Sequence, residues 1–425
     1  MEFLSPSFSY QQGSLYCGKV ALADIAARAG TPVYVYCAQD IAGAFRAYDQ
    51  GLEGVPHKVC YAVKANSNLS VIHLLVRVGA GFDIVSGGEL FRVLKAGGRA
   101  SDVVFSGVGK TADEVEYALR EGIHSFNCES EAELALIDAK ASRLGKRASV
   151  AVRINPDVDA ETHPYISTGL RQHKFGVDIS GIESLYERGR ALRNLVLEGV
   201  SCHIGSQLTS TAPLLDALDK MLAAAERLRA LGHAIRYLDL GGGLGVPYRP
   251  GQKAADIGSY VASVRERLAG RDLTLLLEPG RSIVARAGVL LTRVLYRKEN
   301  RGKQFVVVDA AMTDLIRPSL YKAWHEILPV RQTGMGTIVA DVVGPVCETG
   351  DFLAQDREVA NALPGDVLAV CTAGAYGMVA ASNYNSRPRP AEVLVEGDSW
   401  RVVRARETYE DLIRGEKIPE PLEPR

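Results

Sequence analysis

A lysine lies in an apolar stretch early in the chain, where a charged side chain is unexpected. Lys64 belongs to the sequence Y-A-V-K-A-N and follows a predicted strand over residues 58–63. Burial of an unpaired ammonium group is costly, so loss of solvent is expected to lower the pKa of Lys64 and favour the neutral amine. A neutral lysine amine is the group that forms a Schiff base with a carbonyl compound. The alternative is a lysine at a strand end whose ammonium group reaches solvent.

Three further groups with chemical potential also follow apolar runs. They are His203 with Ser206 in H-I-G-S-Q, the triplet Gly241, Gly242 and Gly243, and the sequence Glu278, Pro279, Gly280 and Arg281. Each group has a structural alternative: a hydrogen-bonded buried histidine, a tight turn and an ion-paired turn, respectively. Their common position after strands is what makes a shared site the better interpretation.

The middle of the chain alternates short apolar runs with stretches of helical period. The runs predict strands at residues 58–63, 82–85, 103–105, 125–128, 149–154, 196–203, 235–240 and 273–278. The helical periods include residues 88–96, 112–120, 131–144, 214–231 and 257–268. Eight strands that alternate with helices predict an α/β fold, a closed TIM-like (β/α)8 barrel rather than an open sheet. Active sites of such barrels lie at the C-terminal strand ends, and phosphate binds after strands 7 and 8.

The pattern changes after residue 281. Short Val-rich runs bounded by Gly and Pro lie at residues 305–308, 338–343, 366–370, 392–395 and 400–403. These runs predict a separate C-terminal β domain over residues 282–425. Residues 1–40 contain another β-like run at 32–36, and this N-terminal segment is expected to join the β domain. The barrel is therefore predicted over residues 41–281.

A lysine, an aromatic ring, glycine loops and a carboxylate at one barrel mouth fit the binding of pyridoxal phosphate. Lys64 is expected to hold this cofactor as a Schiff base, and His203 to stack on its ring. Ser206 and the glycine loops are expected to bind the phosphate, since glycine lets backbone N–H groups approach the oxygens. Glu278 is expected to pair with the pyridine nitrogen and keep it protonated. A protonated ring is a strong electron sink, as decarboxylation requires.

From about residue 32 to residue 407, the chain resembles the pyridoxal-phosphate-dependent decarboxylases of the alanine-racemase fold. The motifs that carry the resemblance are Y-A-V-K-A-N, H-I-G-S-Q, G-G-G and E-P-G-R. The resemblance implies a barrel plus a β domain, with the cofactor at the barrel mouth. An alanine racemase itself fits less well, because that relative uses an arginine where Glu278 faces the cofactor.

A motif in the predicted β domain narrows the resemblance to one family of these decarboxylases. Residues 343–351, V-G-P-V-C-E-T-G-D, look like the G-P-x-C-E-S-G-D motif of the diaminopimelate decarboxylases, whereas ornithine decarboxylases have Cys-Asp at this pair. The resemblance implies that Cys347 protonates the substrate carbon and that Glu348 binds a substrate ammonium group. A small buried side chain is the alternative for Cys347. Thr349 replaces the more common serine, and its methyl group can change the pocket shape slightly.

Two more segments resemble the same family. In D-L-I-R-P-S-L-Y, residues 314–321, Arg317 and Tyr321 are implied to bind the distal end of the substrate, as a guanidinium group suits a carboxylate. Arg281 is expected to add a second positive contact, and Tyr376 in A-G-A-Y-G is expected near the cofactor and substrate. Ordinary ring packing is the alternative for both tyrosines. Together the motifs imply decarboxylation of meso-2,6-diaminopimelate to L-lysine and carbon dioxide.

The composition excludes several other classes of protein. With 49 Lys and Arg against 50 Asp and Glu, the chain has no basic surface for nucleic acid or an anionic membrane. No run approaches the roughly 18 apolar residues of a membrane span. The seven cysteines form no C-x-x-C pair, which indicates reduced thiols in a cytoplasmic protein and no metal site.

The family resemblance also implies a homodimer, in which the Cys347-Glu348 pair reaches the cofactor of the neighbouring subunit. One alternative is a related decarboxylase for a carrier-tethered or polyamine-pathway amino acid, although Arg317 disfavours substrates without a distal carboxylate. Another alternative is a non-catalytic homologue that only binds a partner protein, although such a relative is expected to lack Lys64 or the phosphate loops. Residues 163–169 also resemble the family, as either a closing loop or a static one.

Overall fold

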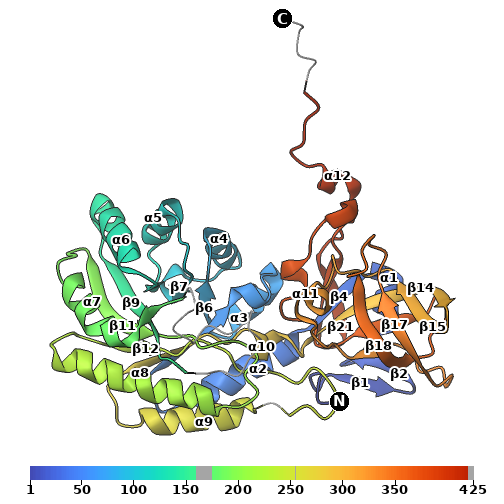
Figure 1. Ribbon diagram of the computed structural model, residues 1–425, viewed down its shortest axis with the longest axis horizontal. Coiled ribbons are helices and arrows are strands. Elements are labelled where there is room, and N and C mark those ends of the chain that lie inside the picture. The colour runs from blue at the N-terminus through green and yellow to red at the C-terminus, as the bar shows by residue number, and fades with distance from the viewer. Residues whose placement is uncertain (159–174, 254, 420–425) are drawn as a thin grey trace, which may run out of the picture.

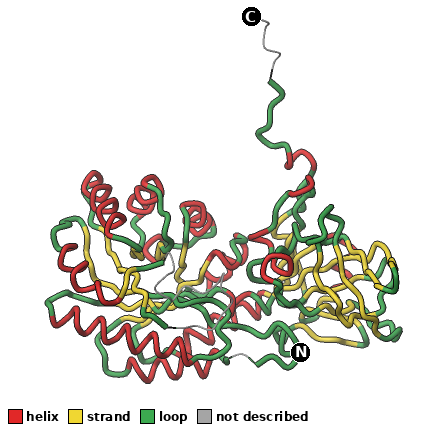
Figure 2. Tube along the Cα trace, viewed as in Figure 1, coloured by secondary structure: helices red, strands yellow, loops and turns green. Residues whose placement is uncertain are grey.

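The computed structural model describes residues 1–158, 175–253 and 255–419. It consists of a barrel surrounded by helices and a β domain beside it (Figure 1). Figure 2 shows that nearly all the long helices belong to the barrel, whereas the β domain consists mainly of strands and loops. The expected two-part architecture is therefore confirmed.

The barrel sheet closes on itself through parallel pairings only. Its order is β13, β5, β6, β7, β8, β9, β11 and β12, with β12 paired to β13 again. The strands are β5 (His57–Ala62), β6 (Gly81–Ile84), β7 (Val103–Phe105), β8 (Ser125–Cys128), β9 (Ala148–Asn155), β11 (Leu195–Ser201), β12 (Tyr237–Asp239) and β13 (Thr274–Leu277). All eight lie within a few residues of the predicted runs, and a short strand, β10 (Val177–Asp178), adds to β9 outside the barrel.

Amphipathic helices cover the outside of the barrel (Figure 1). They are α2 (Ala38–Gly51), α3 (Leu69–Arg77), α4 (Gly87–Lys95), α5 (Ala112–Glu121), α6 (Glu131–Leu144), α7 (Ile182–Gly189), α8 (Ala212–Ala230) and α9 (Ile257–Leu268). The local sequence determines where several of these helices begin. The Ser86, Thr111 and Asp256 side chains accept hydrogen bonds from the first turns of α4, α5 and α9. Each helix then turns its apolar face to the strands, which directs the C-terminal strand ends to one open mouth.

The N-terminal segment joins the β domain, as the sequence predicts. Strand β4 (Val33–Cys37) lies between β14 (Gly288–Asn300) and β20 (Ala391–Glu396). The sheet also contains β15 (Lys303–Val308), β17 (Thr337–Val343), β18 (Phe352–Ala360), β19 (Val367–Val370), β16 (Ile327–Pro329) and β21 (Ser399–Arg404). A separate small sheet of β1 (Phe8–Gln11), β2 (Ser14–Cys17) and β3 (Val20–Ala21) is followed by α1 (Leu22–Ala29).

The β domain is attached directly to the turn that carries Lys64. The backbone N–H of Tyr376 donates to Ala65 O at 2.8 Å, and Asn66 Nδ2 donates to Gly374 O at 3.1 Å. A Cβ atom on Gly374 would lie 1.9 Å from Val284 O, so this approach requires glycine. These contacts hold the β domain against the barrel mouth.

Within the described ranges, no helix is both long and apolar enough to cross a membrane.

Candidate active site

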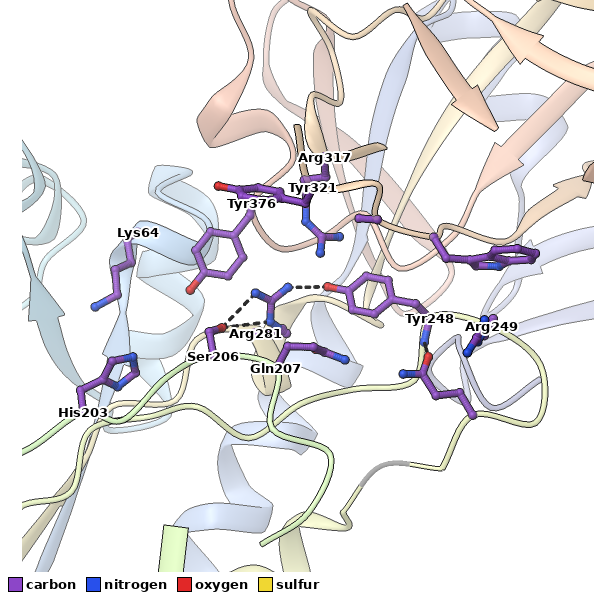
Figure 3. Close-up of a pocket in the computed structure, with 13 residues that line it drawn as sticks. Lys64, His203, Ser206, Gln207, Tyr248, Arg249, Arg281, Arg317, Tyr321 and Tyr376 are labelled. Atoms are coloured by element: carbon purple, nitrogen blue, oxygen red, sulfur yellow. Dashed lines mark hydrogen bonds between the residues drawn. The ribbon is translucent and has the colours of Figure 1, made fainter. Parts of the chain in front are cut away.

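A cavity of about 430 Å³ lies between the barrel mouth and the β domain. The barrel contributes Lys64, His203, Ser206, Gln207, Tyr248, Arg249, Gln252 and Arg281, and the β domain contributes Arg317, Tyr321, Ala323, Trp324 and Tyr376. Figure 3 shows Lys64 and His203 at one end and Arg249 at the other, with Arg281 and Tyr248 between them. The cavity therefore joins seven of the fifteen predicted site residues.

Lys64 is held by an ion pair at the end of the first barrel strand. It lies in a short 3₁₀ turn (Val63–Ala65) that follows β5, and its Nζ is 2.6 Å from Asp83 Oδ2. Loss of solvent lowers the pKa of Lys64, but the carboxylates of Asp83 and Glu278 more than offset this effect and raise the pKa above its ordinary value. The expected lowering of the Lys64 pKa is therefore wrong for the protein without cofactor, because a buried carboxylate lies beside the amine.

Three buried carboxyl groups lie beneath the Lys64 end of the cavity. Asp83 and Asp239 are fully buried, Glu278 is 7 % exposed, and Asp239 and Glu278 share a hydrogen bond. Asn127 Nδ2 donates to Asp239 Oδ2 at 2.8 Å and to Glu278 Oε1 at 3.2 Å. Burial, together with the charges of Asp239 and Asp83, raises the pKa of Glu278 well above its ordinary value. The shared hydrogen bond requires a proton between Asp239 and Glu278, and the raised pKa of Glu278 keeps that proton on the pair.

These carboxyl groups fit the ring nitrogen of a pyridine. Asp83 Oδ1 is buried without a hydrogen-bond partner, so the carboxyl group can accept another donor. A pyridine nitrogen near Glu278 could take up the proton that the Asp239 and Glu278 pair holds, and Lys64, which contacts Asp83, is close enough to these carboxyl groups to react with an aldehyde on that ring. The residues present therefore fit pyridoxal phosphate.

The loops after β11 and β12 form a glycine-lined floor beside His203. The backbone N–H of Gly242 donates to His203 Nδ1 at 3.3 Å. Gly241 has φ +67°, and a Cβ atom there would lie 2.6 Å from Cys202 O. Gly243 has φ +114°, and its Cβ would lie 2.7 Å from Gly205 O. Only glycine allows these loops to pack so closely, and it leaves no side chain between the backbone and a phosphate.

Arg281 lies in the middle of the cavity, just after β13, in the short helix α10 (Arg281–Val284). Its guanidinium group donates to Ser206 Oγ at 2.9 Å and to Tyr248 Oη at 2.6 Å, and it lies 4.7 Å from the ring centre of Tyr376 (Figure 3). Burial raises the pKa of Tyr248, but Arg281 and Arg317 more than offset this and lower the pKa below its ordinary value. The phenol ring thus stabilises two neighbouring cations.

Arg317 begins the helix α11 (Arg317–Tyr321) of the β domain and points into the same cavity (Figure 3). Arg281 and Arg317 are 6 % and 7 % exposed, and neither forms an ion pair within residues 1–158, 175–253 and 255–419. A buried guanidinium group without a carboxylate is costly unless a ligand pairs with it. This end of the cavity therefore fits anionic groups.

Eight predicted site residues do not line the cavity: Gly241, Gly242, Gly243, Glu278, Pro279, Gly280, Cys347 and Glu348. Cys347 and Glu348 are exposed in a turn between β17 and β18, and Cys347 is the exposed member of seven unpaired cysteines. The structural alternative for Cys347, a small buried side chain, is therefore wrong. Pro279 and Gly280 lie in the turn between Glu278 and α10, beneath the cavity. The predicted loop at residues 163–169 lies outside the described residues.

Sequence reasoning missed the lining residues Gln207, Arg249, Gln252, Ala323 and Trp324, and three residues that bear on the chemistry: Asp83, Asp239 and Tyr248. Asp83 was detectable, because it interrupts an apolar run at a strand end as Lys64 does. Asp239 lies two residues before Gly241 and follows the same rule. Tyr248 lies in the loop after β12, where only its position after a barrel strand marks it. Among the described residues, no group of three or more His, Cys, Asp and Glu side chains has the geometry of a metal site.

The sequence matches the family model described as "Pyridoxal-dependent decarboxylase, pyridoxal binding domain" over residues 38–285. The fold and the site thus define the class as the pyridoxal-dependent decarboxylases, whose cofactor is pyridoxal phosphate. A diaminopimelate decarboxylase of Pseudomonas aeruginosa is 56% identical over 97% of this chain and 99% of its own length. One of Vibrio cholerae is 51% identical over 95% and 97% of the two chains.

Solved structures agree with the sequence relatives. A diaminopimelate decarboxylase of M. jannaschii, crystallised with L-lysine, superposes with a TM-score of 0.92 at 36% identity, over 97% of this chain and 98% of that one. The enzyme of Helicobacter pylori, also complexed with L-lysine, gives a TM-score of 0.89 at 44% identity, over 92% and 98% of the two chains. Within the pyridoxal-dependent decarboxylases, this chain belongs to the diaminopimelate decarboxylase family.

Proposed function

We propose that this enzyme removes carbon dioxide from meso-2,6-diaminopimelate and releases L-lysine. The observation that carries the proposal is the pair of buried guanidinium groups, Arg281 and Arg317, which face one cavity and form no ion pair within the described chain. A phosphate and a distal substrate carboxylate are two anions that suit two such groups. Two relatives were solved with L-lysine, which is the product proposed here.

The proposed cofactor residues lie at the Lys64 end of the cavity. When bound, pyridoxal phosphate supplies an electron-poor ring that draws electrons from the bond to the departing carboxyl group. Lys64 binds the cofactor covalently, His203 packs on the ring, and Glu278 holds the proton at the pyridine nitrogen. The phosphate contacts come from Ser206, Gly241, Gly242, Gly243, Pro279, Gly280, Arg281 and Tyr376.

The proposed substrate residues lie towards the β domain. Arg317 and Tyr321 bind the distal carboxylate, and Arg281 and Tyr376 lie between that group and the cofactor. This order leaves the reacting carboxyl group near Lys64. The α-helical turn from Arg317 to Tyr321 holds both distal contacts on one rigid element.

A decarboxylation assay tests the proposed reaction. Purified protein loaded with pyridoxal phosphate is incubated with meso-diaminopimelate, ornithine, lysine or arginine, and the released carbon dioxide is measured. We expect release from meso-diaminopimelate and little from the three amino acids that have no distal carboxylate. Comparable release from ornithine or lysine would contradict the substrate assignment and favour a polyamine-pathway enzyme.

We also propose that two chains build each site. Cys347 and Glu348 are exposed, yet their turn is held firmly: Asp351 accepts from the backbone N–H groups of Val346 and Met312, each at 2.6 Å. A rigid turn that presents a thiol and a carboxylate outside its own cavity suits the cavity of a second copy. In a twofold dimer, Cys347 would then donate the proton to the substrate carbon, and Glu348 would bind an ammonium group.

Subunit mixing tests the shared site. Lys64→Ala and Cys347→Ala dimers should each be nearly inactive. After equal mixing, half of the dimers are heterodimers with one intact site each, so activity should recover to about a quarter of wild type. A lack of recovery despite verified exchange would show that both residues act within one chain.

We propose three segments for the chain: residues 1–40, which join the β domain, the cofactor-binding barrel over 41–281, and the β domain over 282–425. We further propose a cytoplasmic location. The seven unpaired cysteines support a reducing compartment.

A further inference from the structure

The Arg317 guanidinium group has a defined neighbour in the β domain, His325. Arg317 Nη1 lies 2.7 Å from His325 Nε2, and the Arg317 Cζ lies 4.6 Å from the ring centre of Tyr248. Figure 3 shows the guanidinium group between the rings of Tyr376 and Tyr248. The arginine is therefore oriented by a histidine bond at its tip and by an aromatic face beside it.

The hydrogen bonds of His325 fix which ring nitrogen carries the proton. Its Nδ1 lies 2.8 Å from Cys371 O, and because a carbonyl oxygen only accepts, Nδ1 carries the hydrogen. The Nε2 atom of the neutral ring is then an acceptor for the N–H of Arg317. Full burial, with the cations of Arg317, Arg281 and Arg357 nearby, lowers the pKa of His325 well below its ordinary value. The neutral ring that this contact requires is thus the stable form.

His325 is itself held from several sides. It is fully buried between α11 and β16, its ring meets the Tyr248 ring edge-on at 5.2 Å, and Arg357 donates to its carbonyl oxygen. The contacts come from β18, from the strand end at Cys371 and from the barrel loop at Tyr248. The imidazole therefore has little freedom to turn, and the guanidinium group bonded to it shares that restriction.

We propose that His325 is a positioning residue that fixes the Arg317 guanidinium group for the distal carboxylate of the substrate. One N–H of Arg317 is used by His325, and the remaining donors are left to form a paired contact with a carboxylate. Such a contact depends on orientation, so an arginine held in advance loses less rotamer freedom when the ligand binds. The inference rests on the proposed substrate, because it assigns a role at the distal end of that molecule.

Two amide variants separate this role from simple packing. The amide of His325→Asn can still donate to Cys371 O but is too short to reach Arg317, whereas the longer amide of His325→Gln can accept from Arg317. We expect His325→Asn to raise the KM for meso-diaminopimelate by roughly tenfold, as loss of a hydrogen bond to a charged group does, with kcat changed far less. His325→Gln should retain most of the wild-type KM.

An equilibrium measurement adds a readout that does not depend on turnover. Heptanedioate, the seven-carbon dicarboxylate without amino groups, and heptanoate, which has one carboxylate, are compared as ligands of the cofactor-loaded enzyme by calorimetry. His325→Asn should weaken the binding of heptanedioate by roughly tenfold and leave that of heptanoate nearly unchanged. His124→Asn is the control, because His124 packs on Tyr237 at the opposite end of the barrel strands, and it should change neither ligand.

The outcomes distinguish the two proposals. If His325→Gln is as defective as His325→Asn, or more so, the Cys371 bond matters and the positioning role is overturned. If His325→Asn weakens the binding of heptanedioate and of heptanoate equally, the positioning role is also overturned. If the wild-type enzyme does not decarboxylate meso-diaminopimelate, the proposed reaction fails, while the two-ligand comparison still decides whether His325 prepares Arg317 for a carboxylate.

Discussion

The two ends of the cavity hold ionisable groups of opposite kinds. Near Lys64, three buried carboxyl groups face one ammonium group. Near the β domain, two buried guanidinium groups have no carboxylate partner in the described chain. The unpaired guanidinium groups favour an anionic ligand, and the carboxyl groups near Lys64 stabilise a cationic ring. The difference shows that the cavity is built for a molecule with a cationic end and anionic groups.

The same comparison explains how the ligand is oriented. A pyridinium ring is stable beside Glu278 and is repelled by Arg281 and Arg317. A phosphate and a distal carboxylate have the opposite preference. In the proposed arrangement, this difference would orient both the cofactor and the substrate.

Removal of Lys64 is expected to have the largest effect, because it deletes the cation of the carboxylate end and the covalent attachment. Lys64→Ala should lower kcat by more than ~10³-fold, the scale seen when a reacting group is removed. Borohydride reduction of the wild-type holoenzyme followed by peptide mapping should find the pyridoxyl group on Lys64. A label on another lysine would contradict the assignment.

The second largest loss of activity is expected when a charge is removed from the carboxyl groups near Lys64. Glu278→Gln keeps the shape of the side chain but cannot balance a cationic ring, so the pyridine nitrogen should lose its proton. We expect cofactor binding to persist and kcat to fall by roughly 10²-fold, as on loss of one electrostatic stabiliser. The measurement is single-turnover decarboxylation, and an unchanged rate with chemistry rate-limiting would refute the role.

A smaller effect is expected at the arginine end. Arg317→Ala removes the guanidinium group that we assign to the distal carboxylate, so kcat/KM for meso-diaminopimelate should fall by about 10- to 100-fold, with a rise in KM. For an analogue without the distal carboxylate, the loss should be much smaller. Equal losses for both compounds would mean that Arg317 is structural.

The strand pattern of the barrel could be predicted because its strands are buried on both faces and read as continuous apolar runs. Strand β14 was missed, although it is the longest. Its first half is buried and its second half, from Tyr296 onwards, is mostly exposed and charged, so no single period marks it. Strand β18 was missed for a similar reason, since charged residues interrupt its centre.

The site residues likewise divide into those that the sequence predicts and those that it does not. Lys64, His203 and Glu278 could be predicted because each follows a barrel strand, and the rule for barrels places such residues at one mouth. The raised pKa of Lys64 could not be predicted, because Asp83, the carboxylate that raises it, comes from the next strand. His325 has no sequence signal at all, since its role depends on contacts with Arg317 and with Cys371, which lies 46 residues away.

The smallest effect on activity is expected at Asp314, which precedes Arg317 by three residues and is 4 % exposed. Burial raises its pKa to about 7 against the opposing effect of Arg387 and Arg406, so below that pH the carboxyl group is mostly neutral. A carboxyl group whose pKa is higher in the folded state than in the unfolded state destabilises the fold as pH rises between the two values. The penalty for Asp314 should grow from about pH 4, reach order ~4 kcal/mol near pH 7, and stay constant above it.

Asp314→Asn tests this interpretation. The amide oxygen can still accept the bond from the Ala311 N–H, which the carboxylate accepts at 2.7 Å, but it never becomes charged. Thermal unfolding of both proteins from pH 4 to pH 9 should give a variant whose Tm exceeds that of the wild type by a few degrees at pH 8. The difference should shrink towards pH 4, and the KM for meso-diaminopimelate should not change. A variant with a lower Tm at pH 8, or a higher KM, would contradict this interpretation. Such a result would show that an ionised Asp314 supports Arg281 and Arg317 and that the positive charge of these two residues is balanced from within the chain.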